Sequence, residues 1–127
     1  MSWETRTLPE VYDLLAPDGS EIRLLGRVPG ASLVHCQLAP GAVTQAVRHR
    51  TVEELWYCVR GAGQLWRRFG AQSQIIDLKP GVSVTIPLGV EFQFRSTGAV
   101  PLELVIATTP PWPGADEAVA VDGIWAR

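Results

Sequence analysis

The chain has 127 residues, of which 46% are hydrophobic, and its 11 basic and 13 acidic side chains give a net charge of −2. A chain of this length buries one core, so a single domain over residues 1–127 is expected. Both signs of charge are mixed along the sequence, which argues against a nucleic-acid partner. No apolar run reaches the ~18 residues of a membrane span, and the charged N-terminus does not resemble a signal peptide, so a cytoplasmic location is expected.

Short strands separated by turn residues are predicted along the whole chain. The segments are rich in β-branched and aromatic residues, and Pro-Gly, Asp-Gly or Gly-Ala-Gly sequences stand between many of them. Short strands at intervals of about 8–12 residues are typical of an all-β sandwich or barrel. The predicted strands are 10–15, 21–25, 31–38, 43–48, 53–60, 64–69, 73–78, 82–87, 90–96 and 101–108.

Alternation of apolar and polar residues defines the inward faces of the later strands. Phe92 and Phe94 share one face of their strand, and the polar residues between them share the other. The strand over 53–60 is apolar on both faces, which is expected where the outer face of a barrel meets another layer or a second subunit. Cys36 and Cys58 lie in apolar strands without zinc-motif spacing, so both are interpreted as buried free thiols. A disulfide is the alternative.

Two glycine-framed segments carry a family resemblance. The first runs from Gly41 to Gly61, and the second begins at Gly81 and ends at Ser96. Their spacing resembles the two signature motifs of the cupin family of small β-barrels. The resemblance covers about residues 31–108 and implies a single-domain cupin-type barrel, a jelly roll of two packed antiparallel sheets. The N-terminal strands and the proline- and tryptophan-rich C-terminal tail are expected to pack on this core.

The cupin motifs also imply a metal site, with two histidines and a glutamate in the first motif and a third histidine in the second. His49 and Glu54 fall on two of these four positions, whereas Val47 and Phe92 fall on the others and cannot bind a metal. A metal site on His49 and Glu54 therefore needs a third ligand, for which the candidates are His35 and Glu91. Imidazole and carboxylate together suit zinc, iron, manganese or nickel.

The alternative to a metal site is a hydrogen-bonded pair of His49 and Glu54 in a polar pocket. A carboxylate beside a histidine favours its charged form, so this pair is also the candidate for general acid–base catalysis. Strand periodicity places Trp56 and Cys58 on the face of Glu54, and Phe92 and Phe94 on the family's ligand face. Together these six residues are predicted to line a pocket for a small ligand with an apolar body and a polar end.

Three functions follow from these patterns. The first is a cupin barrel that binds a small molecule in its interior, with no assigned activity. The second is a metal-dependent cupin enzyme, of dioxygenase or isomerase type, that uses His49, Glu54 and a substitute ligand. The third is a partner-binding module that uses the outer sheet and the tail, where Tyr57, Trp112 and Trp125 stand out. An open sheet edge is relieved by pairing, and cupins commonly pair through their sheets, so a homodimer is expected.

Overall fold

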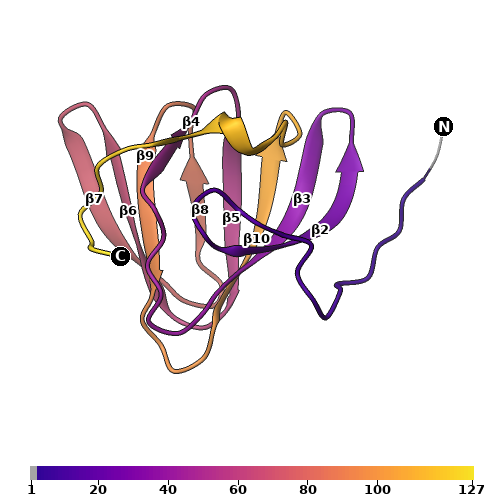
Figure 1. The fold of residues 1–127 in the computed structure, drawn as a ribbon, viewed down its shortest axis with the longest axis horizontal. Coiled ribbons are helices and arrows are strands. Elements are labelled where there is room, and N and C mark those ends of the chain that lie inside the picture. The colour runs from indigo at the N-terminus through magenta and orange to yellow at the C-terminus, as the bar shows by residue number, and fades with distance from the viewer. Residues whose placement is uncertain (1–2) are drawn as a thin grey trace.

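The computed structural model describes residues 3–127, and its regular secondary structure consists almost entirely of antiparallel strands (Figure 1). Two sheets face each other. The first has six strands in the order β1-β2-β3-β10-β5-β8, with bounds Leu14–Leu15, Glu21–Val28, Ala31–Leu38, Leu102–Thr109, Glu53–Arg60 and Ser83–Ile86. The second has five in the order β11-β4-β9-β6-β7, with bounds Ala118–Ala120, Val47–His49, Glu91–Ser96, Gly63–Phe69 and Gln72–Leu78. A single 3₁₀ turn, η1 (Ala115–Glu117), completes the secondary structure of the described residues.

This architecture confirms the predicted fold class: an all-β jelly roll of two packed antiparallel sheets. The inward side chains of both sheets form one core, and β9 contributes Phe92 and Phe94 to it as the alternation predicted. The turn glycines of the two motifs, Gly41, Gly61 and Gly81, all have positive φ, which glycine adopts without steric cost. No helix in residues 3–127 is both long and apolar enough to cross a membrane.

Two predicted strands are much shorter in the structure. Only Leu14 and Leu15 of the predicted strand 10–15 pair with β2, because the Arg23 side chain binds the backbone carbonyls of Pro9 and Glu10 in place of a strand neighbour. Of the predicted strand 43–48, only the end becomes β4, which continues to His49. In the rest of the segment, Val43 forms an isolated bridge with Arg95 of β9, and the Thr44 hydroxyl donates to the carbonyl of Phe94 and accepts from its N–H.

The C-terminal tail lies across the second sheet of the same chain. Its strand β11 pairs with β4, an element that the sequence analysis did not predict. Further along, the side chain of Gln93 on the outer face of β9 accepts hydrogen bonds from the backbone N–H groups of Ile124 and Trp125, and the guanidinium of Arg95 lies 4.4 Å from the Trp125 ring centroid. The tail thus covers Gln93, which is 2% exposed on a face that alternation assigned to polar residues.

Both cysteines are buried and free, as predicted. Strand β10 separates them, because Leu104 is the register partner of Cys36 on one side and of Cys58 on the other. Two thiols with a strand between them are too far apart for a disulfide, so that alternative is wrong.

Candidate functional site

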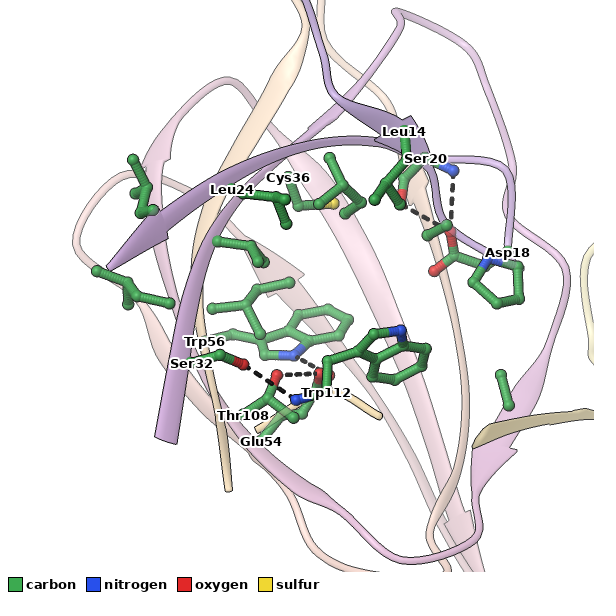
Figure 2. Close-up of a pocket in the computed structure, with 18 of the residues that line it drawn as sticks. Leu14, Asp18, Ser20, Leu24, Ser32, Cys36, Glu54, Trp56, Thr108 and Trp112 are labelled. Carbon is green, nitrogen blue, oxygen red and sulfur yellow. Dashed lines mark hydrogen bonds between the residues drawn. The ribbon is translucent and has the colours of Figure 1, made fainter. Parts of the chain in front are cut away.

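A cavity of about 350 Å³ opens between the two sheets (Figure 2). Its walls come from β1, β2, β3, β4, β5, β9 and β10, from N-terminal residues before β1, from the turn before β2, and from the tail after β10. Most of the lining is aliphatic or aromatic, and a few polar side chains interrupt it. This volume and character are typical of small-molecule sites. The lining includes Asp18, Val34, Cys36, Val47, His49, Glu54, Trp56, Phe92, Phe94, Thr108 and Trp112.

Glu54 lies on the inward face of β5 and is fixed by two donors. The indole N–H of Trp56 donates to its Oε1 at 3.0 Å, and the hydroxyl of Thr108 donates to its Oε2 at 2.8 Å (Figure 2). Burial raises the pKa of Glu54 to about 7, and these two hydrogen bonds only partly offset that effect. The carboxyl group is therefore oriented and titrates near neutral pH.

His49 ends β4 and lines the same cavity, with only 5% of its surface exposed. Its ring stands edge-on to Phe92 at 5.2 Å and to Trp112 at 5.4 Å between centroids. Its buried Nδ1 has no hydrogen-bond partner. Burial lowers the pKa of His49 to about 4, against a weaker opposite effect of Glu117, so the imidazole is neutral at physiological pH.

The predicted hydrogen-bonded pair of His49 and Glu54 is wrong. Within residues 3–127, the side-chain partners of Glu54 are Trp56 and Thr108, and no bond joins the carboxylate to the imidazole. The two groups lie on different sheets. Glu54 bonds to Thr108 on the adjacent strand β10, and His49 packs on Phe92 of the adjacent strand β9. The expectation that the carboxylate keeps His49 charged fails for the same reason, since burial is the larger effect on its pKa.

Two polar side chains of the cavity, His49 and Glu54, differ in how they exchange protons near neutral pH. The neutral His49 carries one protonated and one unprotonated ring nitrogen. Glu54 donates when protonated and accepts when ionised, with both forms populated near pH 7. The arrangement is suited to a polar or charged group on a ligand whose remainder is apolar.

A resident metal does not fit these residues. Val47 and Phe92 replace the two histidines that the cupin motifs would place here. They are direct register partners across β4 and β9, and both are buried, so an apolar contact stands where two metal ligands would be needed. In the described part of the chain, no three His, Cys, Asp or Glu side chains are grouped so that they could hold a metal ion.

Neither substitute ligand is available to His49. His35 faces the outer side of β3, where its Nε2 lies 2.9 Å from Glu103 on β10. Its strand neighbour Cys36 is the residue that faces the cavity. Glu91 begins β9 and forms an ion pair with Arg68 on β6. Because side chains alternate along a strand, His35 and Glu91 point away from the cavity that their neighbours Cys36 and Phe92 line.

The predicted pocket set is mostly brought together. Trp56, Phe92 and Phe94 line the cavity with His49 and Glu54, and Trp56 packs edge-on to both phenylalanines at 5.5 and 5.0 Å between centroids. Cys58 is buried in the core but does not line the cavity. Its strand passes the β-bulge between Glu103 and Leu104 near this point, and core side chains fill the space between the sheets there.

Among the lining residues that sequence reasoning missed, three bear on the chemistry or closure of the cavity: Asp18, Thr108 and Trp112. Asp18 lies in a Pro-Asp-Gly sequence that was interpreted only as a turn, yet its carboxylate accepts bonds from the N–H and hydroxyl of Ser20 and lines the cavity (Figure 2). Alternation along β10 would have found Thr108. Trp112 follows a Pro-Pro pair, and its N–H donates to the Ser32 hydroxyl on β3, which brings the tail to the cavity.

A carboxylate from the tail holds the turn between His49 and Glu54. Glu117 in η1 accepts hydrogen bonds from the Thr51 N–H at 2.6 Å, the Thr51 hydroxyl at 2.5 Å and the Val52 N–H at 3.1 Å. Burial acts to raise the pKa of Glu117, but these bonds outweigh it and hold the pKa below its ordinary value. The tail therefore helps to position both polar residues of the site.

Comparisons with known proteins agree with this fold. The sequence model described as the Cupin domain matches residues 34–108, more than half of the chain. The xanthan biosynthesis protein XanB of Xanthomonas campestris pv. campestris (strain B100) is 28% identical over 88 residues, which cover 69% of this chain and 18% of that protein. This chain thus matches less than a fifth of that relative's length. The uncharacterized protein MJ1618 of Methanocaldococcus jannaschii is 26% identical over 117 residues, covering 85% of this chain and 90% of that one.

Solved structures share the fold at low sequence identity. The Streptomyces protein PAC13, solved as a variant with uridine, superposes with a TM-score of 0.75 at 19% identity, covering 98% of this chain and 95% of that one. A second structure describes Pac13 as a nucleoside dehydratase. Oxalate decarboxylase from Bacillus subtilis gives a TM-score of 0.74 at 15% identity and covers 95% of this chain but 33% of that one. At these identities the likeness shows the fold alone.

Proposed function

We propose that this chain, which belongs to the cupin domain family, binds a small molecule in the cavity between its sheets. The observation that carries the proposal is the cavity itself, about 350 Å³ enclosed mostly by aliphatic and aromatic side chains, with Glu54 and a neutral His49 in its lining. A largely apolar wall with a few oriented polar groups is typical of small-molecule sites. The Glu54 carboxyl group, held by Trp56 and Thr108, is oriented to meet a polar group of the ligand.

The aromatic side chains define how such a ligand is held. Trp56, Phe92 and Phe94 form an edge-to-face cluster on one part of the wall, and Trp112 packs on His49 beside it. Aromatic rings contribute large apolar contact areas with few rotatable bonds. The ligand's apolar part therefore lies against these rings, and its polar end meets His49 and Glu54.

A cavity-filling substitution tests this proposal. Val34→Phe adds a ring to the cavity wall on β3, and we expect it to abolish binding of fragments that the wild-type protein binds. The measurement is a ligand-observed NMR screen of neutral, cationic and anionic fragments, with uridine included because a protein of the same fold was solved with it.

The control, Ile75→Phe, adds a ring at an exposed position of β7, on the other sheet and outside the cavity lining. It should leave the fragment hits unchanged, and thermal melts of both variants would verify that they fold. A library without a single hit on the wild-type protein, or hits that persist in Val34→Phe, would contradict the proposed function.

The outer face of the six-stranded sheet supports a second, separate proposal, that two copies pair there. Leu55, Tyr57 and Val59 follow one another on this face of β5 and are 57%, 49% and 41% exposed. Apolar surface of this kind is buried at homodimer interfaces, where a two-fold axis lets one patch cover its copy.

Light scattering after gel filtration should give the mass of a dimer for the wild-type protein and of a monomer for Tyr57→Arg. An arginine at the centre of the patch places a charge opposite its symmetry mate. Ile75→Arg, which changes an exposed apolar residue of β7 on the other sheet, should stay dimeric. A monomeric wild-type protein would exclude this pairing.

A further inference from the structure

Within residues 3–127, no salt bridge joins a lysine or an arginine to Asp18 or Glu54, the two acids of the inner cavity wall. The electrostatic influences on the pKa of Glu54, after burial and its two hydrogen bonds, come from the acids Asp18 and Glu117, and both raise it. Burial also raises the pKa of Asp18, although Arg127 at the C-terminus lowers it in part. The inner wall thus combines carboxyl groups with a neutral histidine.

The two arginines that line the cavity do not supply the missing charge. Both are exposed: Arg6 lies in the segment before β1, and Arg27 lies near the end of β2. Their charges are screened by water, and neither contributes to the pKa of Glu54 or of Asp18. Glu4 lines the same rim and accepts a bond from the backbone N–H of Arg27, so the rim carries both signs of charge.

Each acidic group keeps the capacity to accept from a ligand. A carboxylate has about four lone-pair positions, and the two protein donors to Glu54 leave the others free. In Asp18, both bonds from Ser20 go to Oδ1, and the second oxygen carries none (Figure 2). His49 lines the same cavity as a neutral imidazole and brings no positive charge to it.

Aromatic rings surround these acceptors. Trp56 and Trp112 both line the cavity near Glu54, as the close-up shows (Figure 2). The face of an indole ring carries partial negative charge and attracts cations, most strongly when water is excluded. Carboxylate acceptors and aromatic faces in one cavity are the chemistry that recognises an ammonium group.

We propose that the cavity takes a small organic cation, a protonated primary amine on a compact apolar body, with its ammonium group at Glu54. This inference rests on the proposed function and specifies its ligand class. The N–H donors of the ammonium meet the acceptor oxygens of Glu54, the field of Asp18 favours the positive charge, and the body packs on the aromatic rings. A neutral ligand leaves the ionised carboxylate uncompensated, and an anion is repelled by it.

The titration of Glu54 gives the proposal a pH signature. Because its pKa is about 7, the carboxyl group is about nine-tenths ionised at pH 8 and about one-tenth ionised at pH 6. Two other groups of the cavity keep their charge in this interval: the pKa of His49 is about 4, and burial raises that of the Cys36 thiol further above its ordinary value. Burial also raises the pKa of Asp18, so any protonation of Asp18 on acidification weakens cation binding in the same direction. Protonation of Glu54 should therefore weaken cation binding by about tenfold from pH 8 to pH 6.

Three ligands of similar shape test the charge directly. Isothermal titration calorimetry at pH 8 would compare benzylamine, benzyl alcohol and benzoate. We expect benzylamine to bind at least about tenfold more tightly than benzyl alcohol, because a bond to a buried charged group contributes at least that factor. Benzoate should bind least well. At pH 7, heats measured in buffers of different ionisation enthalpy should show that benzylamine binding releases a fraction of a proton from Glu54.

Matched variants separate the site from general surface charge. Glu54→Gln keeps the shape of the side chain but removes the negative charge, and should reduce benzylamine binding to the level of benzyl alcohol. Glu53→Gln changes the net charge equally at the exposed neighbouring position and should bind as the wild type does. Val34→Phe should abolish binding of every ligand.

The outcomes distinguish this inference from the function on which it rests. Equal affinities for benzylamine and benzyl alcohol, or benzylamine binding that Glu54→Gln leaves intact, would overturn the cation inference. Binding that Val34→Phe abolishes would still support a ligand cavity in either case. Fragment hits restricted to neutral or anionic molecules would likewise refute the cation alone. A screen without any hit would refute both.

Discussion

Glu117→Ala is expected to lower the free energy of unfolding by about 3 kcal/mol, because it leaves buried donors without an acceptor. The Glu117 carboxylate receives three hydrogen bonds from Thr51 and Val52, and Val52 is completely buried, so water cannot replace the acceptor at its N–H. Glu117→Gln should cost less, since the amide keeps one acceptor oxygen but loses the charge that strengthens these bonds. Urea denaturation at pH 7 measures both losses.

The neighbouring carboxylate provides the control. Asp116 lies in the same 3₁₀ turn but is exposed, so Asp116→Asn should change the stability by less than about 0.5 kcal/mol. Amide hydrogen exchange of Thr51 and Val52 should accelerate in Glu117→Ala and stay slow in the control. If Glu117→Ala unfolds at the same urea concentration as the wild type, the carboxylate does not hold this turn.

The pH dependence of Glu117 follows from its lowered pKa. The folded protein releases this proton more readily than the unfolded chain, so the contribution of Glu117 to stability is present above the ordinary pKa of 4.5. It is lost as the pH falls through the lower value in the folded state. The difference in stability between wild type and Glu117→Gln should therefore shrink below pH 4.5.

Glu54→Gln should have the opposite effect and stabilise the ligand-free protein at pH 8. The pKa of Glu54 rises from 4.5 to about 7 on burial, so the folded state holds the proton more tightly than the unfolded chain. The contribution of this group to stability is complete below pH 4.5 and is lost as the pH rises through about 7. Removing the charge should raise the free energy of unfolding at pH 8 by on the order of 2 kcal/mol, allowing for solvent in the cavity.

Comparing the wild type with Glu54→Gln isolates the pH dependence that Glu54 contributes to stability. The comparison is needed because His49 changes the stability with pH in the opposite direction. Its pKa falls from 6.5 to about 4, so its contribution is present above pH 6.5 and is lost as the pH falls through 4. Between pH 4.5 and 6.5 the two slopes oppose each other in the wild type. Denaturant midpoints of wild type and Glu54→Gln at pH 5 and pH 8 should differ far more at pH 8. A gap that is the same at both values would argue against a buried, titrating carboxyl group.

The two carboxylates have different roles: Glu117 stabilises the fold, and Glu54 is the candidate for ligand binding. Glu117 is saturated with protein donors and stabilises the turn between β4 and β5. Glu54 destabilises the protein when it is ionised and no ligand is bound. Groups with pKa values perturbed in this way are characteristic of functional sites. A cationic ligand at Glu54 would relieve the cost. Loss of benzylamine binding in a more stable Glu54→Gln protein would therefore separate a binding role from a folding role.

Much of the fold is encoded locally and could be predicted from the sequence. Turns at Gly41, Gly61 and Gly81 are determined by the conformational freedom of glycine, and all three have positive φ. Alternation along β9 determines that Phe92 and Phe94 face the same side, since a strand repeats every two residues. The same local rule, with the spacing of the two cupin motifs, identified His49, Glu54 and Trp56, which line the cavity together.

Only the tertiary structure decided what these residues do, because the deciding contacts join segments far apart in the chain. Alternation alone did not determine which face of β3 turns inward, and the pairing of β3 with β10 places His35 outside, against Glu103. The pKa of Glu54 depends on burial and on a hydroxyl from β10, neither of which is encoded near it in sequence. Glu117, 66 positions after Thr51, fastens the turn between the two site residues. Sequence patterns thus determined the strands and their faces, whereas burial and long-range hydrogen bonds determined the chemistry of the cavity.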